Sequence, residues 1–154
     1  MKEETARLIL DQTKENYNLI AQSFSQTRNH LWPDFDYFKK YLKAGDRVLD
    51  IGCGNGRLYE FIKDNNIGYR GQDISPSLTE EAKKKYPEIA DSFSVGDILD
   101  LKENVDSLDK IFCLAVLHHL PSNNLRLQAL RNLRQVLRPG GLLFLTCWNL
   151  WNNK

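Results

Sequence analysis

Short apolar segments alternate with amphipathic segments along the chain from about residue 46 onward. The apolar segments have the length of strands, and the amphipathic ones repeat apolar residues at three- and four-residue steps, as helices do. The pattern predicts strands at residues 47–51, 68–73, 92–95, 110–116 and 141–148, and helices at residues 58–65, 75–86 and 124–137. Because strands that alternate with helices pair in parallel, we expect an α/β fold with a doubly wound, mostly parallel sheet. Its ligand should lie at the carboxyl ends of the strands.

The first 45 residues follow a different pattern. Apolar residues predict a helix over residues 3–25, Pro33 breaks the helical pattern, and a second helix follows at residues 34–42. We expect residues 1–45 to form a helical lid and residues 46–154 to form the core. The 154 residues contain no internal repeat and no linker, so we expect a single domain.

The composition is that of a globular protein. Apolar residues make up 42% of the chain, charged residues 27%, and the formal net charge is +1. Cys53, Cys113 and Cys147 lack metal-ligand spacing and are typical of buried thiols in a reducing compartment, so no metal site is expected. The polar N-terminus and the lack of a long apolar run predict no signal peptide, no membrane association and a cytoplasmic location.

The last part of the chain is locally basic. From Lys110 onward there are six Lys or Arg residues and no Asp or Glu. Arg131, Arg134 and Arg138 share one stripe of the predicted helix at residues 124–137. This stripe fits a solvated helix face, and the alternative is a track for phosphate groups.

A glycine cluster follows the first predicted strand, in the sequence Asp-Ile-Gly-Cys-Gly-Asn-Gly at residues 50–56. Glycines suit a sharp turn that brings backbone close to a ligand, and the N–H groups at the next helix start favour an anionic or dipolar group. A dinucleotide-binding loop would have a small third residue at position 57, where this chain has Arg57. The spacing therefore argues against a nicotinamide or flavin dinucleotide.

Two acids lie at the ends of the next two predicted strands. Asp73 can accept hydrogen bonds from both hydroxyls of a ribose, and Asp97 lies where an adenine amino group would need an acceptor. Either acid alone could belong to a solvated loop. A nicotinamide enzyme would also have an acid near Asp73, so Asp97 and the loop spacing distinguish the two kinds of site.

These motifs, together with residues 96–98, 112–120 and 137–141, resemble class I S-adenosylmethionine (SAM)-dependent methyltransferases. The resemblance implies a Rossmann-like core and SAM as cofactor, with glycines around the methionine, Asp73 at the ribose, Asp97 at the adenine and Val116 beside the methionine chain. The cofactor-binding residues that it implies are Asp50, Gly52, Cys53, Gly54, Asn55, Gly56, Asp73, Ile74, Asp97, Ile98, Val116 and Leu117.

The sheet of this family has seven strands, whereas this sequence stops after the fifth. Without the last two strands, residues 142–148 form an edge strand with unpaired backbone groups. We therefore expect either that the chain is part of a longer protein or that another chain covers this edge, including a second copy through self-association.

A narrower resemblance lies near the N-terminus. Residues 17–21 (Tyr-Asn-Leu-Ile-Ala), residues 24–28 (Phe-Ser-Gln-Thr-Arg) and Trp32-Pro33 are similar to the N-terminal segment of the tRNA wobble-uridine carboxymethyl methyltransferases. That family also has a similar Ala-Val-x-His-His stretch and a Trp after the fifth strand. The resemblance implies esterification of 5-carboxymethyluridine in the tRNA anticodon, with Arg28 and His118 near the methyl group, and often a small zinc-binding activator subunit.

This reaction fits the chemistry of the residues. A carboxylate is ionised at neutral pH and needs orientation more than a strong base, and the guanidinium of Arg28 can supply a bidentate contact. His118 could position the uridine or be purely structural, and the same holds less strongly for His119. Trp148 and Trp151 could stack on a base or could be core residues. The alternatives to tRNA modification are a small-molecule methyltransferase acting on a carboxylate, quinone or phenol, and a non-catalytic SAM-binding fragment.

Overall fold

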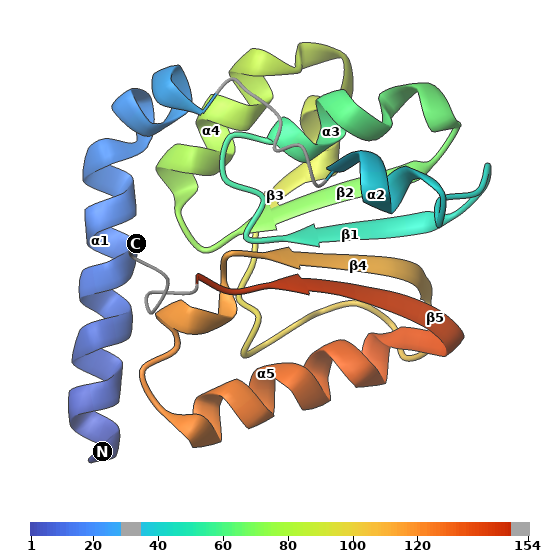
Figure 1. The fold of residues 1–154 in the computed structure, drawn as a ribbon. Helices are drawn as coiled ribbons and strands as arrows, with labels where there is room; N and C mark the ends of the chain where they lie inside the picture. The colour runs from blue at the N-terminus through green and yellow to red at the C-terminus, as the bar shows by residue number, and fades with distance from the viewer. Residues whose placement is uncertain (29–34, 149–154) are drawn as a thin grey trace, which may run out of the picture.

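A computed structural model describes residues 1–28 and 35–148 and confirms the α/β fold (Figure 1). Over these residues one sheet of five strands has the order β3-β2-β1-β4-β5, and all neighbouring strands are parallel. The strands are β1 (Arg47–Ile51), β2 (Gly68–Asp73), β3 (Phe93–Val95), β4 (Leu108–Leu114) and β5 (Leu137–Thr146). The strand order reverses between β1 and β4, which places a ligand crevice at their carboxyl ends.

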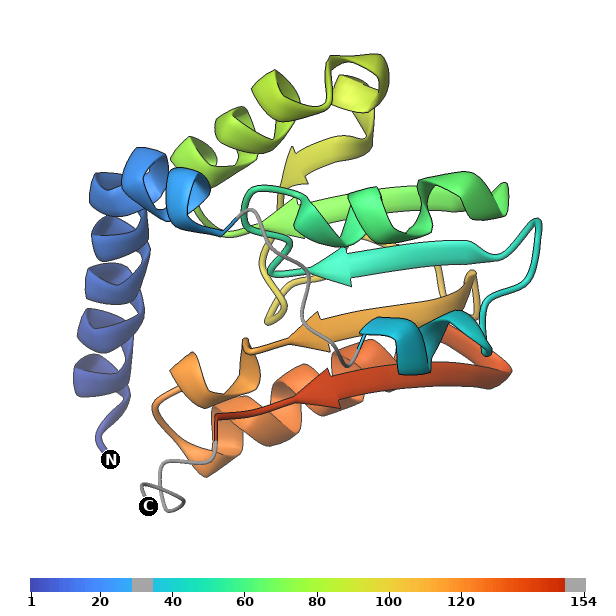
Figure 2. The same ribbon diagram turned by 45° about the horizontal axis from the view of Figure 1, so that its top comes forward.

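Helices cover both faces of this sheet. The helices α2 (Phe35–Lys39), α3 (Arg57–Ile62) and α4 (Pro76–Lys85) lie on one face, and α5 (Asn123–Val136) lies on the other (Figures 1 and 2). The long helix α1 (Glu3–Thr27) stands across the carboxyl ends of the strands, where the arrowheads point (Figure 1). Three short 3-10 helices complete the described elements, namely η1 (Lys63–Asn65), η2 (Pro87–Ser92) and η3 (Leu117–His119).

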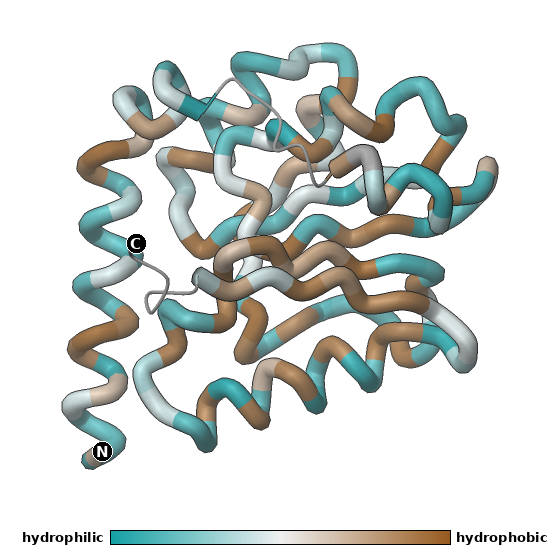
Figure 3. Tube along the Cα trace, in the orientation of Figure 1, coloured by the Kyte–Doolittle hydropathy of each residue, from teal (hydrophilic) through white to brown (hydrophobic). Residues whose placement is uncertain are grey.

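Each face of the sheet has its own apolar core. Val48 and Phe112 belong to the cluster on the α3 side, whereas Leu49, Ile111 and Leu133 belong to the cluster on the α5 side. Adjacent residues of one strand thus point into opposite cores, which explains the continuous apolar runs of β1 and β4. Figure 3 shows the same arrangement as apolar colour along the strands and mixed colour along α1.

Serine caps fix the starts of two helices. The Ser75 hydroxyl accepts a hydrogen bond from the backbone N–H of Leu78 at 3.2 Å, and Pro76 occupies the first turn, which confirms the predicted start of α4. Ser122 caps α5 in the same way by accepting from the N–H of Leu125 at 3.3 Å, so this helix begins one residue before the predicted position.

The boundaries of β4 and β5 differ from the prediction because of contacts between these two strands. β4 ends at Leu114 because Ala115 has a φ of +58° and its N–H donates to the carbonyl (3.1 Å) and to Oγ1 (3.0 Å) of Thr146. β5 begins at Leu137, which pairs with Leu108, and ends at Thr146. The helix predicted at residues 34–42 is also shorter, since α2 ends at Lys39.

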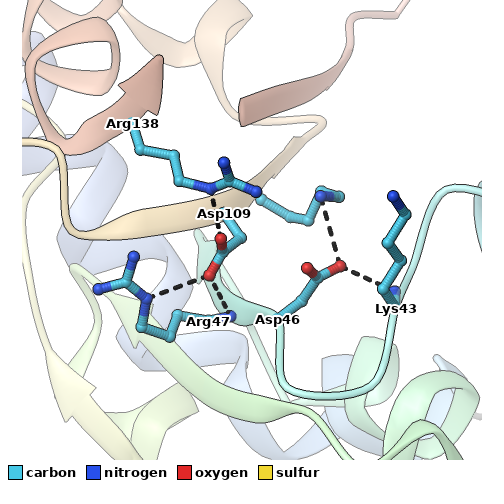
Figure 4. A network of polar contacts seen from close by, with 6 residues as sticks. Lys43, Asp46, Arg47, Asp109 and Arg138 are labelled. Atoms are coloured by element: carbon cyan, nitrogen blue, oxygen red, sulfur yellow. Dashed lines mark hydrogen bonds and ion pairs between the residues drawn. The ribbon is translucent and has the colours of Figure 1, made fainter. Parts of the chain in front are cut away.

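Ionic contacts tie the strands together at their amino ends, opposite the ligand end (Figure 4). Asp109 accepts hydrogen bonds from the N–H and the guanidinium of Arg47 at 2.8 and 3.1 Å, and also from the guanidinium of Arg138. Beside this group, Lys110 and Asp46 form a buried ion pair with a Nζ–Oδ2 distance of 3.3 Å. These contacts join the starts of β1, β4 and β5.

The outer edge of β5 has no partner strand among the described residues. Leu142 and Leu145 on this strand are each 38% exposed. The predicted edge strand is thus confirmed, and the expectation that another chain or further strands cover it remains a prediction. Among the residues that the structure describes, no helix is long and apolar enough to cross a membrane, and no group of His, Cys, Asp and Glu could hold a metal ion.

Candidate functional site

A cavity of about 1220 Å³ lies between α1 and the carboxyl ends of the strands. Its walls come from the inner face of α1, the loop after β1, the ends of β2 and β3, and the segment after β4. Most of the predicted site residues border it, namely Arg28, Asp50, Gly52, Cys53, Gly54, Asn55, Asp73, Ile74, Asp97, Ile98 and Val116. The structure therefore brings together residues that are up to 88 positions apart in the stretch from Arg28 to Val116.

The glycine loop is fastened to the end of β2. The N–H groups of Gly52 and Cys53 both donate to the carbonyl of Gln72, at 2.7 and 3.0 Å. Gly52 has a φ of +75°, and a Cβ at this position would lie 2.2 Å from Cγ2 of Val116. Only glycine therefore fits here, because a side chain would meet both an unfavourable backbone conformation and the segment after β4.

Asp73 holds this loop through its carboxylate. Oδ2 accepts from the N–H of Gly54 at 2.8 Å, and Oδ1 accepts from the N–H of Ser75 at 2.9 Å. Burial raises the pKa of Asp73, and the two N–H donors oppose that shift. Each carboxylate oxygen can accept a second hydrogen bond, so the acid retains the capacity to bind a pair of ribose hydroxyls.

Asp50 at the end of β1 is buried and accepts a hydrogen bond from the hydroxyl of Tyr69 at 3.0 Å. Burial and the nearby charge of Asp73 raise the pKa of Asp50 to about 7, against the opposing effect of the Tyr69 hydrogen bond. The neighbouring Cys53 is buried as well, and burial raises the pKa of its thiol well above the ordinary value. Cys53 is therefore a thiol that shapes the loop rather than a nucleophile.

The segment after β3 forms the far end of the cavity. The Asp97 carboxylate accepts from the N–H of Leu99 at 2.8 Å, and Asn132 on α5 donates to the carbonyl of Ile98 at 3.0 Å. A Cβ on Gly96 would lie 2.6 Å from Oε1 of Gln72. The backbone here is thus held from both sides, with the Asp97 and Ile98 side chains bordering the cavity.

Asn55 has a contact that the sequence analysis did not predict. Its side chain is buried, and its amide donates to the carbonyls of Ser25 and Arg28, at 3.2 and 3.4 Å. The glycine loop thereby holds the C-terminal end of α1. Arg28 follows that end, borders the cavity, and places its guanidinium carbon 5.4 Å from the centroid of the Phe24 ring.

The two histidines after β4 have different environments. His119 borders the cavity, and its Nε2 lies 3.0 Å from the hydroxyl of Tyr17 on α1. His118 stacks on Trp148 with the ring centroids 4.9 Å apart, and neither of its buried ring nitrogens has a hydrogen-bond partner among the described residues. Burial lowers the pKa of both rings, so both are neutral at pH 7.

Some predicted residues do not border the cavity itself. Gly56, Leu117 and His118 are not part of its lining, and a Cβ on Gly56 would lie 2.8 Å from the Phe93 ring. Trp32, Pro33 and Trp151 lie outside the described residues. Conversely, Tyr17 and Phe24 line the cavity although neither was predicted as a site residue. Both lie in the motif at residues 17–28, and their seven-residue spacing puts them on one face of α1.

This site can be compared with known families. A profile described as a methyltransferase domain matches residues 48–141, more than half of the chain. The chain belongs to the methyltransferase domain family. The family implies SAM as the methyl donor, and the matched residues include the glycine loop, both acids at the strand ends and the segment after β4.

Two curated relatives of this methyltransferase domain carry the name tRNA (carboxymethyluridine(34)-5-O)-methyltransferase. The Arabidopsis thaliana protein is 35% identical over 132 residues, which are 86% of this chain and 31% of the relative. The Saccharomyces cerevisiae protein is 35% identical over 134 residues, which are 87% of this chain and 47% of the relative. The chain therefore spans less than half the length of either relative.

A solved methyltransferase also shares the fold. It forms a complex with the Haloferax volcanii Trm112 methyltransferase activator, and it aligns with this chain at a TM-score of 0.58 and 24% identity. The alignment covers 93% of this chain and 59% of that chain. At this identity the likeness shows a common fold.

Proposed function

We propose that this chain binds SAM at the glycine loop and transfers the methyl group to the carboxylate of 5-carboxymethyluridine at the tRNA wobble position. The observation that carries the proposal is that Arg28 and a wall of aromatic rings share one cavity with Asp73 and Asp97. A cation and stacking surfaces suit an acceptor that is both a carboxylate and a base. The names and the 35% identity of the two curated relatives support this acceptor.

The cavity residues fit SAM as the methyl donor. A Cβ at Gly52 would overlap Val116, so glycine at this position lets the loop pack against the segment after β4 at the cavity wall. Asp73 and Asp97 provide acceptors for ribose and adenine. The bound cofactor would supply an electrophilic methyl group on a sulfonium sulfur.

The residues on the acceptor side act by orientation and by excluding water. The acceptor carboxylate is already ionised at pH 7, so no residue has to remove a proton from it. Arg28 would hold this carboxylate in line with the methyl group through its planar guanidinium. His119 lines the same cavity and is neutral, so it would not add a second positive charge that weakens the nucleophile.

Trp148 is the candidate for stacking on the uracil ring. It borders the cavity, is 59% exposed and already stacks on the His118 ring. Stacking of a base on an aromatic side chain is worth about 1–3 kcal/mol and tolerates a modified pyrimidine. His118 would act from behind Trp148, by positioning that ring.

Cofactor binding is tested first, by isothermal titration calorimetry with SAM. The variant Asp73→Asn should weaken binding by at least about tenfold, because a charge-assisted hydrogen bond to the ribose is lost. Asp91→Asn, which changes an exposed carboxylate on η2, is the control and should bind like the wild type. Equal affinity in Asp73→Asn and wild type would refute the ribose assignment.

The acceptor is tested with tRNA that carries 5-carboxymethyluridine, with mass spectrometry of the nucleosides as the readout. Arg28→Lys keeps the charge but loses the bidentate fork, so it should lower kcat/KM well below that of the control Arg131→Lys on the outer face of α5. If both variants lower activity alike, the basic stripe of α5 binds tRNA and Arg28 has no special role. A wild type that binds SAM and leaves this tRNA unmodified would contradict the acceptor.

A small-molecule carboxylate is the second candidate acceptor. It is favoured by α1, which lines the cavity and stands across the carboxyl ends of the strands (Figure 1), so that a small acceptor would contact this helix. Methylation of free carboxylic acids, with no modification of tRNA, would select this alternative. A non-catalytic SAM-binding fragment would show SAM binding and neither reaction.

The proposal includes a small zinc-binding activator subunit as a partner. The methyltransferase in the Haloferax volcanii complex has a partner of the activator class, and β5 offers an unpaired edge among the described residues. Analytical ultracentrifugation of the chain alone and with an activator distinguishes a heterodimer from self-association through β5. A chain that stays monomeric in both samples would contradict both partners.

A further inference from the structure

A hydrogen bond joins the lid helix to the turn after β4, across the cavity. The hydroxyl of Tyr17 on α1 lies 3.0 Å from Nε2 of His119, the last residue of η3. The two rings meet edge to face with their centroids 5.4 Å apart. Both residues border the cavity, so this bond bridges its two walls.

Few residues of α1 are fully buried. Among the α1 residues only Ala6 and Ala21 are fully buried, whereas Leu8 and Leu19 are 65% and 81% exposed. Two small side chains bury little apolar area, so they contribute little to holding a helix of 25 residues. The half-buried Leu10 and Phe24 add apolar contacts, Leu10 with the α5-side core and Phe24 with the glycine loop, and polar contacts then fix the helix at defined points.

Polar contacts hold the middle and the C-terminal end of α1. The Tyr17–His119 bond and a 2.6 Å hydrogen bond from the Ser75 hydroxyl to Asn18 lie near the middle of the helix. The Asn55 amide holds its C-terminal end. Of these, the Tyr17–His119 bond is the one that reaches the cavity-lining segment after β4.

Tyr17 is connected to Arg28 through the ring of Phe24. Phe24 meets the Tyr17 ring edge to face at 5.8 Å, and the Arg28 guanidinium lies over Phe24. Phe24 also lies 3.4 Å from the position of a Cβ on Gly54. Fixing Tyr17 therefore fixes Phe24 against the glycine loop and Arg28 beside the cavity.

We propose that Tyr17 and His119 form a positioning pair that closes α1 over bound SAM and sets Arg28 for the acceptor. The inference rests on the proposed function, since it assigns the cavity to SAM and the carboxylate to Arg28. Burial and the Asp73 charge raise the pKa of Tyr17, and burial lowers that of His119, so the pair is uncharged at pH 7. Such a bond can break and re-form without stranding a charge in the cavity.

The test measures the dissociation rate of SAM by stopped flow, with hydrogen exchange of the α1 amides in the ligand-free protein as a second readout. Tyr17→Phe removes only the hydroxyl, and His119→Ala removes its partner. Tyr41→Phe is the matched control. It deletes a hydroxyl that lies 3.0 Å from the Tyr37 hydroxyl, and neither residue lines the cavity. His119→Gln can restore an amide near the position of Nε2.

We expect Tyr17→Phe and His119→Ala each to speed SAM release by about threefold to tenfold, the range that one neutral hydrogen bond supports. The double variant should be no faster than either single variant, and both should speed exchange of the α1 amides. His119→Gln should return the rate toward that of the wild type, and Tyr41→Phe should leave it unchanged.

Two results would overturn the inference separately from the proposed function. If the wild type binds SAM but the two single variants release it at the wild-type rate, the pair has no positioning role while the cofactor assignment stands. If their effects multiply in the double variant, the residues act independently and the pair is refuted. A folded wild type that does not bind SAM would refute the cofactor assignment and, with it, the role given to the pair.

Discussion

The substitution Gly52→Ala tests the packing of the glycine loop against the segment after β4. Gly52 has a φ of +75°, and its Cβ would lie 2.2 Å from Cγ2 of Val116, which is more than 1 Å closer than ordinary carbon–carbon contact. Val116 follows Ala115, whose N–H is held by Thr146. The segment therefore cannot move away without disturbing the contact between β4 and β5.

The magnitude follows from two separate costs. A left-handed backbone costs an L-residue about 1–2 kcal/mol, of which the lower entropy of the unfolded alanine chain offsets about 0.4–1 kcal/mol. The overlap with Val116 adds about 1–3 kcal/mol, as overpacking of a well-filled site does. Gly52→Ala should therefore lower the free energy of unfolding by about 2–4 kcal/mol.

Gly140→Ala isolates the backbone cost. Gly140 has a φ of +76°, almost the same as Gly52, but a Cβ there would meet nothing within 4 Å. Gly140→Ala should therefore lower the free energy of unfolding by only about 0.5–1 kcal/mol. Urea unfolding followed by circular dichroism gives both values, and the difference between them is the clash.

Val116→Ala in the Gly52→Ala background is the decisive comparison. Removing the two methyl groups should recover part of the lost stability, although Val116→Ala alone destabilises the protein. The reasoning would be refuted if Gly52→Ala cost no more than Gly140→Ala, or if the double variant showed no recovery. Either result would mean that Val116 does not lie against the loop.

Three further predictions concern buried charge. Lys110→Met should lower the free energy of unfolding by about 3–5 kcal/mol, because Asp46 is left as a buried, unpaired carboxylate; Asp46→Asn in the same background should restore part of it in urea titrations. Asp109 is subject to burial, which raises its pKa, but the Arg47 N–H and the guanidinium groups of Arg47 and Arg138 lower it to about 2. Its stabilising contribution is therefore present above pH 3.8 and lost as the pH falls through about 2, so Asp109→Asn should flatten the acid limb of a stability–pH profile. The pKa of Asp50 is raised to about 7, mainly by burial, so its contribution is greatest below pH 4 and is lost as the pH rises through 7. Asp50→Asn should remove that decline, and an unchanged profile would contradict the burial of its charge.

The parts of the fold and site that could be predicted from the sequence depend on local rules. The glycine spacing after β1 and the position of Asp73 at the end of β2 follow from the chain turning at the edge of a parallel sheet. Ser75 followed by Pro76 gives the start of α4, since both residues favour the first turn of a helix. These features involve neighbours in sequence, and the sheet order then brings them together.

The turn at Ala115 could not be predicted in this way. Alanine rarely has a positive φ, and nothing in the apolar run of β4 indicates one. The turn is stabilised by Thr146, which lies 31 residues further along the chain and binds the Ala115 N–H through both its carbonyl and its hydroxyl. This tertiary contact ends the strand early and orients the two histidines. As a result His119 lines the cavity, whereas His118 was the histidine predicted from the sequence to lie near the methyl group.

The role of Asn55 was missed for a related reason, and it changes how the site should work. A polar residue in a glycine loop suggests a ligand contact, but here its amide holds the end of α1 through the carbonyls of Ser25 and Arg28. Because Asn55 lies between two glycines of the loop, a ligand that orders this loop also orders the residues before Arg28. Under the proposed function, SAM binding at the loop and the position of Arg28 should therefore be coupled through the buried Asn55 side chain. The amides of α1 should therefore become more protected from hydrogen exchange when SAM occupies the loop. Asn55→Ala should abolish that gain in protection, while the Asp73 contacts with Gly54 and Ser75 stay in place.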